Sequence, residues 1–282
     1  MKNIVVGIDF SPSSENALRH AIAVAIKAKA TIHLVYVKLQ KASSAVEKAA
    51  QEDLLKKAVK RLAELTEDAK REAPMCNVQS IILEGKPALE ICKYAHNLEQ
   101  AMIAVGTHGT SGFDEKNVGS NTIKIVSETK IPVLSVREHI NIGRDLTQIL
   151  VPIDESFETL QKMKHAVTFA KLFTAKILLL GTNTSTHPES KHVINVQLGH
   201  AKAMCEKANV RYDVLSISIK DNICQSLVEY AKNADVNLMI IMREEEEEFF
   251  DFWLGTSTRR LISIAPMPLL IVPNINHFSV NK

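Results

Sequence analysis

The sequence of 282 residues lacks the features that set unusual chains apart from ordinary globular proteins. Glycine (10) and proline (9) are few, which excludes a collagenous or linker-like chain. No apolar run approaches the roughly 20 residues that cross a bilayer, so we expect no membrane partner. Aromatic residues make up only 5% of the chain, but hydrophobic residues make up 46%, which is enough for sizeable buried cores. A chain of this length is expected to form two domains or one large one.

A strong net charge and paired cysteines are also missing. The 34 Lys and Arg residues against 32 Asp and Glu leave a net charge of +2. A dedicated nucleic-acid reader would show a basic face and a high pI, so we expect no nucleic-acid partner. The four cysteines form no C-x-x-C pair, which argues against a zinc ribbon or a redox dithiol. The N-terminus enters a strand-like run without the flanks of a signal peptide, and we predict a cytoplasmic protein with reduced thiols.

The chain contains an internal repeat. The strand-like run that ends at Asp9 aligns with the run that ends at Asp154, at an offset of 145 residues. Later in the chain, Gly119 aligns with Gly255 at an offset of 136 residues. The nine residues between the two offsets indicate a deletion in the second copy, between its second strand and its third helix. The repeat predicts a tandem duplication.

Each copy shows the pattern of alternating strands and helices. In the first copy we expect strands over 4–8, 31–37, 77–83, 101–105 and 133–136, and helices from Ser11-Pro12 and over 44–73, 87–97 and 119–129. The apolar stripe of the long helix is predicted to consist of Leu54, Ala58, Leu62, Leu65 and Ala69. Short, almost unbroken apolar strands between helices indicate a parallel sheet covered on both faces. We therefore predict two tandem α/β domains, 1–140 and 146–282, joined near 139–145.

The residues that follow the strands are the candidates for a site, because open parallel sheets bind ligands beyond the carboxyl ends of their strands. The expected fourth strand leads into Gly106-Thr107-His108-Gly109, and Gly119-Ser120-Asn121-Thr122 opens the next helix. Glycines let backbone amides approach a phosphate, and a helix N-terminus adds unpaired N–H groups. Asp9, at the end of the first strand, can meet a ribose hydroxyl or a metal that rides on phosphates. The loop is neither a Walker A motif nor G-x-G-x-x-G.

The full spacing, Gly106-x-x-Gly109-x(9)-Gly119-Ser120, resembles the nucleotide-binding signature of the universal stress protein family. The opening run 6–11, with Asp9 at the strand end and Ser11 shortly after, resembles the same family. The resemblance covers essentially the whole chain, twice, and matches the tandem two-domain type. It implies a doubly wound, five-stranded parallel sheet of order 3-2-1-4-5 in each domain, with ATP, with or without Mg²⁺, bound by backbone groups.

Carried over by position, the resemblance implies a set of phosphate-binding residues: Gly106, Gly109, Gly119, Ser120, Asn121 and Thr122. His108 lies in the same loop, from which it can contact phosphate. Asp9 would face the ribose, and Val37 would offer its backbone to adenine. The sequence departs from the family where Asn121 replaces a hydrophobic residue and where Asp114 and Glu115 replace apolar ones. These two carboxylates would oppose a polyanion if they pointed inward.

The second copy lacks both loop glycines. Met242 and Glu245 stand where the first copy has Gly106 and Gly109, and Glu245 lies within the acidic run Glu244–Glu248. Like charges a few ångströms apart cost on the order of 1 kcal/mol each even in water, so we predict no ATP in this domain. The run is interpreted as a solvated surface loop, with a recognition patch or a divalent-metal site as alternatives. The aromatic residues that follow it are predicted to serve packing: Phe249, Phe250, Phe252 and Trp253.

No catalytic nucleophile, general base or metal-ligand pattern can be assembled from the sequence, so we predict no catalytic or metal-ligating residue. The leading hypothesis is a stress-associated regulatory protein that binds ATP or ADP in its first domain, with a structural or regulatory second domain. A slow ATP-hydrolysing enzyme and a nucleotide-free protein-interaction module are the alternatives. The resemblance also implies that the two halves pair as an intramolecular pseudo-dimer through their fifth strands. A homodimer and an unidentified protein partner are left open.

Overall fold

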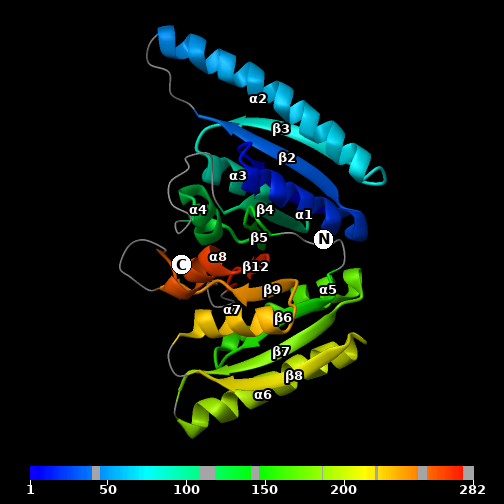
Figure 1. The fold of residues 1–282 in the computed structure, drawn as a ribbon, viewed down its shortest axis with the longest axis vertical. Coiled ribbons are helices and arrows are strands. Elements are labelled where there is room, and N and C mark those ends of the chain that lie inside the picture. The colour runs from blue at the N-terminus through cyan, green and yellow to red at the C-terminus, as the bar shows by residue number, and fades with distance from the viewer. Residues whose placement is uncertain are drawn as a thin grey trace. The chain divides into compact units, whose positions relative to one another are not determined.

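A computed structural model of the chain describes residues 1–39, 45–107, 118–140, 146–185, 187–219, 222–246 and 253–275. The chain divides into two compact units, Met1–His139 and Ile140–Lys282. Each unit is an α/β fold in which helices cover both faces of a parallel sheet (Figure 1), as the sequence predicts.

The first unit alternates strands and helices along the chain. Its elements are β1 (Asn3–Ile8), α1 (Pro12–Ala28), β2 (Thr31–Lys38), α2 (Ala45–Glu72), β3 (Val78–Glu84), α3 (Pro87–His96), β4 (Ala101–Gly106), α4 (Ser120–Glu128) and β5 (Val133–Val136). The strands pair in parallel in the order β3-β2-β1-β4-β5. This is the predicted order 3-2-1-4-5, and it places the ends of β1 and β4 side by side at the point where the strand order reverses.

Local sequence explains how α1 is held against the sheet. Ser11 caps the helix by accepting a hydrogen bond from the backbone N–H of Ser14, and Pro12 occupies the first turn. The helix ends at Lys29, which adopts a left-handed conformation with φ of 52°. The buried side of α1 includes Ala17, Ala21 and Ala25, whose small side chains allow close packing on the sheet.

The long helix α2 forms as predicted, but its apolar stripe is shorter. Ala58, Leu62, Leu65 and Ala69 are buried, whereas Leu54 is 63% exposed. A helix of 28 residues is about 42 Å long, whereas the eight residues of β2 span about 27 Å. The helix is therefore longer than the strand it packs on, and its N-terminal turns have no sheet beneath them to bury Leu54.

The second unit repeats this order of elements. It contains β6 (Gln148–Ile153), η1 (Phe157–Leu160), α5 (Met163–Phe173), β7 (Lys176–Asn183), α6 (Pro188–Lys207), β8 (Tyr212–Ser218), α7 (Ile223–Asn233), β9 (Leu238–Met242), β10 (Glu245–Glu246), β11 (Trp253–Leu254), α8 (Thr256–Ile264) and β12 (Leu269–Val272). Its parallel strands follow the order β8-β7-β6-β9-β12, again 3-2-1-4-5. None of the helices in the described part of the chain combines the length and apolar character that a bilayer crossing requires.

Strand register shows that the two units are copies. Ile4 pairs with Met102 in the first unit, and Ile149 pairs with Leu238 in the second, so both sequence offsets recur in the pairing. The helix after the second strand has 28 residues in the first unit and 20 in the second, which accounts for most of the shortening. The helix after the first strand also differs, because the second unit opens it with the separate 3-10 turn η1.

Candidate functional site

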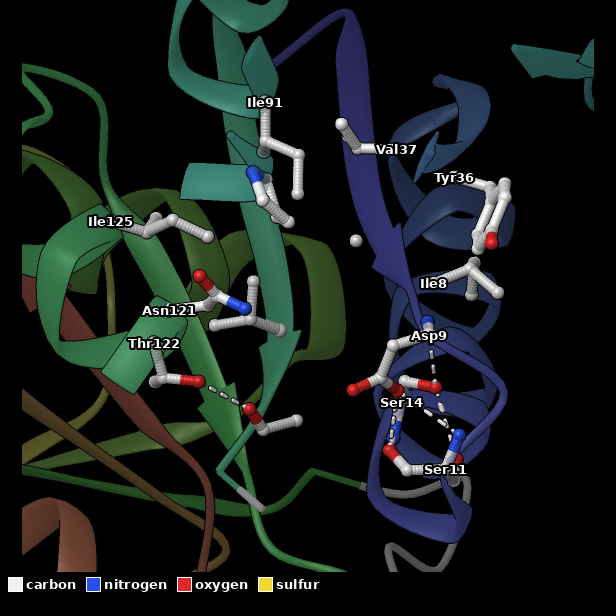
Figure 2. A pocket seen from close by; sticks show the side chains of 14 residues that line it. Ile8, Asp9, Ser11, Ser14, Tyr36, Val37, Ile91, Asn121, Thr122 and Ile125 are labelled. Atoms are coloured by element: carbon white, nitrogen blue, oxygen red, sulfur yellow. Dashed lines mark hydrogen bonds between the residues drawn. The ribbon is translucent and has the colours of Figure 1, made fainter. Parts of the chain in front are cut away.

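A small cavity of about 90 Å³ lies at the carboxyl ends of β1, β2 and β4, between the first turns of α1 and α4 (Figure 2). Five residues that the sequence singled out line it: Asp9, Val37, Gly106, Asn121 and Thr122. They come from four elements that lie far apart in the sequence. The parallel sheet brings them together because all of its strands end at the same edge.

The remaining predicted residues have different outcomes. Gly119 is the N-cap residue of α4, and its N–H donates a hydrogen bond to the backbone carbonyl of Thr107 at 2.7 Å. Ser120 begins the helix and is exposed, and neither residue lines the cavity. His108 and Gly109 lie outside the described residues, as do Asp114 and Glu115. The structure therefore places Gly106 and the helix half of the glycine motif at or beside the cavity, whereas the roles of His108 and Gly109 stay predictions.

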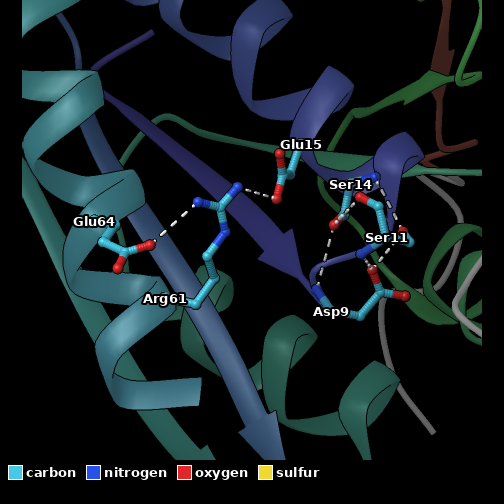
Figure 3. A network of polar contacts seen from close by, with 6 residues as sticks. All are labelled: Asp9, Ser11, Ser14, Glu15, Arg61 and Glu64. Carbon is cyan, nitrogen blue, oxygen red and sulfur yellow. Dashed lines mark hydrogen bonds and ion pairs between the residues drawn. The ribbon is translucent and has the colours of Figure 1, made fainter. Parts of the chain in front are cut away.

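The Asp9 carboxylate is held in place by the turn that follows it (Figures 2 and 3). Its Oδ1 accepts hydrogen bonds from the backbone N–H of Ser11 at 3.0 Å and from the Ser11 hydroxyl at 2.5 Å. Phe10, between them, adopts a left-handed conformation with φ of 62°, which lets the chain reverse within two residues. Among the described residues, no group bonds the second carboxylate oxygen, so Oδ2 is available to a ligand hydroxyl or cation.

Ser14 and a neighbouring ion pair support this turn. The Ser14 hydroxyl donates to the backbone carbonyl of Ser11 at 3.0 Å and accepts from the backbone N–H of Asp9 at 3.4 Å. The next residue along α1, Glu15, accepts a hydrogen bond from Arg61 of α2 at 2.8 Å, as Figure 3 shows. Glu64 also accepts from Arg61, and the two carboxylates raise the pKa of the guanidinium. The Asp9 turn is thus connected to both α1 and α2.

Gly106 and the N-terminus of α4 form the opposite wall. The Thr122 hydroxyl donates to the backbone carbonyl of Gly106 at 2.6 Å (Figure 2). A Cβ on Gly106 would lie 2.5 Å from the Ser13 carbonyl carbon and 2.6 Å from the Ser14 backbone nitrogen, so only glycine fits here. The first-turn N–H groups of a helix have no intrahelical acceptor and carry a partial positive charge, which suits an anion at this wall.

Several residues that line the cavity carry no motif that predicts them from the sequence. Ser14 and Tyr36 add polar atoms, and Ile91 and Ile125 add apolar surface. Tyr36 could have been found from its place just before Val37 at the end of β2. The two isoleucines carry no such signal, because any apolar helix residue that faces the sheet has the same pattern.

The second unit has a larger cavity, of about 620 Å³, in the corresponding position. It is lined at the strand ends by Asp154 and Thr182, where the first unit has Asp9 and Val37. The acidic run is only partly a solvated loop, because Glu245–Glu246 form β10 and pair antiparallel with β11. The run beyond Glu246 and the aromatic residues 249–252 lie outside the described residues.

Lys162 is a feature of this second cavity that the sequence analysis missed. It is 2% exposed and lines the cavity, in the position where α1 has Ala17. Its ammonium donates to the Thr159 hydroxyl at 2.9 Å. Burial lowers the pKa of Lys162 to about 8, an effect that the negative charge of Asp154 partly opposes. The sequence did contain a signal for this residue: helical periodicity assigns position 162 to the buried face, where a lysine is unusual.

No metal site emerges from the described residues, among which no three His, Cys, Asp or Glu side chains are grouped closely enough to hold an ion. The buried thiols are also chemically quiet. Burial raises the pKa of Cys92 and of Cys205 to about 11, so neither is a thiolate at neutral pH.

Comparison with known proteins gives a consistent family. The profile of the universal stress protein family matches residues 1–137 and again 146–273. A universal stress protein of Methanocaldococcus jannaschii is 28% identical over 150 residues, which cover 49% of this chain and 82% of that protein. A universal stress protein of Bacillus subtilis is 28% identical over 144 residues, covering 48% of this chain and 97% of the relative.

Solved structures match the fold over nearly the whole chain. The crystal structure of a universal stress protein from Archaeoglobus fulgidus superposes with a TM-score of 0.76 at 14% identity, covering 97% of both chains. A putative universal stress protein from Pseudomonas aeruginosa superposes with a TM-score of 0.64 at 14% identity, covering 97% of this chain and 93% of the other. At such low identity these similarities concern the fold.

Proposed function

Because this chain belongs to the universal stress protein family, we propose that its first domain, 1–140, binds an adenine nucleotide, ATP or ADP, and that the protein is a cytoplasmic regulator in a stress response. The observation that carries the proposal is the meeting of three features at one cavity. Asp9, the backbone of Gly106 and the first-turn residues of α4, Asn121 and Thr122, all line the same space. This combination suits a ligand with hydroxyls at one end and an anion at the other.

Each element has a proposed role. Asp9 Oδ2 would accept hydrogen bonds from ribose hydroxyls, and the backbone of Val37 would face adenine. The first turn of α4, with Ser120, Asn121 and Thr122, would receive phosphate oxygens together with the loop that contains His108 and Gly109. Mg²⁺, when bound with ATP, would neutralise phosphate charge. Nucleotide bound at this site would regulate the protein's interaction with partners, and the nucleotide would not be consumed in a catalytic reaction.

The volume of the cavity sets a condition on binding. Pockets for small organic ligands measure about 300–1,000 Å³, whereas this cavity measures about 90 Å³. Tyr36 and Asn121, two of its lining residues, are partly exposed and can rotate outward without leaving a hole in the core. We expect these side chains to move when the nucleotide binds. The small volume is also the observation that favours the alternative, a nucleotide-free interaction module.

The test is direct identification of the bound ligand. Mass spectrometry of the supernatant after denaturing purified protein should reveal ATP or ADP, and calorimetric titration with ATP-Mg should give about one site per chain. Gly119→Glu, which puts a carboxylate at the N-terminus of α4, should abolish this binding in a folded protein. Gly199→Glu is the matched control, because a Cβ at Gly199 in α6 would meet no atom within 4 Å.

The outcomes separate the candidate functions. No released nucleotide and no heat on titration would refute the proposal and favour the interaction module. Two ATP molecules per chain would contradict the expectation that the second domain, 146–282, excludes ATP. Release of inorganic phosphate from bound ATP at a steady rate would favour the slow enzyme. Loss of binding in both glycine variants would mean that the effect of Gly119→Glu is not local.

A further inference from the structure

We propose that the cavity of the second unit is a separate binding site, for a nucleoside that carries no phosphate, and that the Glu244 carboxylate takes the place of the phosphate. This proposal rests on the proposed function of the first unit, because it treats the second cavity as a modified copy of the first unit's nucleotide site. It concerns a different ligand and a different set of residues, so it can be tested on its own.

The hydroxyl-binding end of the site is retained. Asp154 Oδ1 accepts hydrogen bonds from the backbone N–H of Ser156 at 2.8 Å and from the Ser156 hydroxyl. The backbone N–H of Asp154 donates to the Thr159 hydroxyl at 3.2 Å. These contacts repeat those of Asp9, and in the described part of the chain Oδ2 of Asp154 likewise has no bonding partner. A carboxylate oxygen held in this way accepts hydrogen bonds from a vicinal diol.

The anion-binding end is already filled by the chain. Glu244 Oε2 accepts a hydrogen bond from the backbone N–H of Ser257, in the first turn of α8, at 3.1 Å. The Glu244 backbone N–H donates to the Thr258 hydroxyl at 3.0 Å, which holds the residue against the helix. A Cβ on Gly255 would lie 2.7 Å from Glu244 Oε2, so the side chain fits closely over the helix N-terminus. A phosphate at this position would have to displace the carboxylate.

The cavity between these two ends has room for a nucleoside. Its volume of about 620 Å³ lies within the about 300–1,000 Å³ of organic-ligand pockets. Apolar side chains from three helices and a strand form walls suited to a planar base: Ile194, Leu227, Ile241 and Leu261. Asn183 and Thr184, at the end of β7, add amide and hydroxyl groups that can bond its edge.

The charges around the cavity favour an uncharged ligand. Four carboxylates line it, Asp154, Glu155, Glu158 and Glu244, against the cations Lys162 and Arg243. A phosphate-bearing ligand would meet an excess of negative charge. Lys162, whose ammonium donates to Thr159, and Arg243 balance only two of these four negative charges. Ligand hydroxyls, in contrast, can donate to these carboxylates.

The experiment uses the full chain with Asp9→Asn and Gly119→Glu, which remove the proposed hydroxyl acceptor and the proposed phosphate site of the first unit, and adenosine as the probe. Calorimetry should show about one adenosine per chain, with AMP and ATP at least tenfold weaker. Asp154→Asn, which keeps an oxygen to accept from Ser156, should weaken adenosine at least tenfold. Glu244→Ala should strengthen AMP at least tenfold and change adenosine little. Glu189→Ala removes an exposed carboxylate outside the cavity and should change neither.

Three results would overturn the proposal: no heat with adenosine, equal affinity for adenosine and ATP, or adenosine binding that Asp154→Asn leaves intact. Unchanged thermal melting of each variant shows that a loss of binding is not a loss of fold. A chain with Asp154→Asn and an intact Gly119 reports ATP binding by the first unit alone. Failure there, with adenosine still bound by the chain that carries Asp9→Asn and Gly119→Glu, would refute the proposed function and leave the second site standing.

Discussion

The hydroxyl of Thr122 donates a hydrogen bond to the backbone carbonyl of Gly106 at 2.6 Å, and so joins the N-terminus of α4 to the end of β4. Thr122 is 5% exposed, which shields this bond from water. The contact fixes the distance between the proposed phosphate-binding helix and the strand end that faces Asp9. The effect of this hydrogen bond on stability and on nucleotide binding can be measured by replacing the Thr122 hydroxyl.

Thr122→Val replaces the hydroxyl with a methyl group of similar shape and leaves the Gly106 carbonyl without this donor. We expect the unfolding free energy to fall by about 1–3 kcal/mol, the cost of a buried acceptor that loses its partner. Nucleotide affinity should fall with it, because α4 loses its tie to β4. Urea unfolding and calorimetric titration measure the two effects. Thr122→Ser, which retains the hydroxyl, should keep most of the affinity, and an equal loss in both variants would contradict this role.

Gly106→Ala tests whether the close approach of α1 to β4 requires glycine. The new Cβ would overlap the Ser13 backbone at 2.5 Å, and backbone atoms cannot move aside cheaply. We expect a loss of about 1–3 kcal/mol in unfolding free energy, as for overpacked cores. Gly199→Ala in α6 is the matched control, because its Cβ would meet nothing within 4 Å. Alanine has a higher helix propensity than glycine, so Gly199→Ala should raise the unfolding free energy by up to about 1 kcal/mol. Similar melting shifts for both variants would disprove the steric explanation.

Lys162 is expected to reduce stability at neutral pH. Burial lowers the pKa of its ammonium from 10.5 to about 8, so between these values the unfolded chain binds the proton more strongly than the folded one. The penalty is complete below pH 8 and disappears as the pH rises toward 10.5. Lys162→Met should therefore raise the unfolding free energy at pH 7 by about 1–3 kcal/mol. This advantage should shrink as urea melts are repeated up to pH 10.5, and an advantage that stays constant with pH would argue against a buried charge.

His165 is expected to contribute to acid sensitivity. Burial lowers its pKa from 6.5 to about 4, and the positive charge of Lys164 acts in the same direction. As the pH falls from 6.5 toward 4, the unfolded chain takes up a proton that the folded chain rejects, so stability is lost in this window. His165→Gln should lose less stability than the parent chain between pH 6.5 and 4 in matched urea melts. Parallel pH profiles for the two proteins would show that this group does not titrate as described.

Much of the fold follows from short-range patterns in the sequence. Apolar runs such as 4–8 and 101–105, separated by helical periodicity, predict the order of strands and helices, and the paired aspartates Asp9 and Asp154 reveal the duplication. The strand order came from the family resemblance, and the register of Ile4 with Met102 confirms it. Such features are visible because they repeat along the chain at fixed spacing.

The site is only partly visible in this way. Gly106, Asn121 and Thr122 could be named in advance, because a helix start after a glycine loop has a recognisable order of residues. Leu54 was assigned to the core and is exposed, because periodicity reports a helix face but not where the neighbouring sheet ends. Cavity volume, about 90 Å³ in one copy and about 620 Å³ in the other, has no sequence signature at all.

Local patterning along the chain was sufficient for the duplicated α/β architecture and for several residues that line the first cavity, since both depend on which residues end the strands. Tertiary packing alone decided the character of the second site. In a sequence, a lysine and a glutamate indicate solvated charges. Only the folded chain buries Lys162 and places the Glu244 carboxylate at the N-terminus of α8. Contacts between separate elements, or between a side chain and the end of a helix, depend on how the elements meet in space.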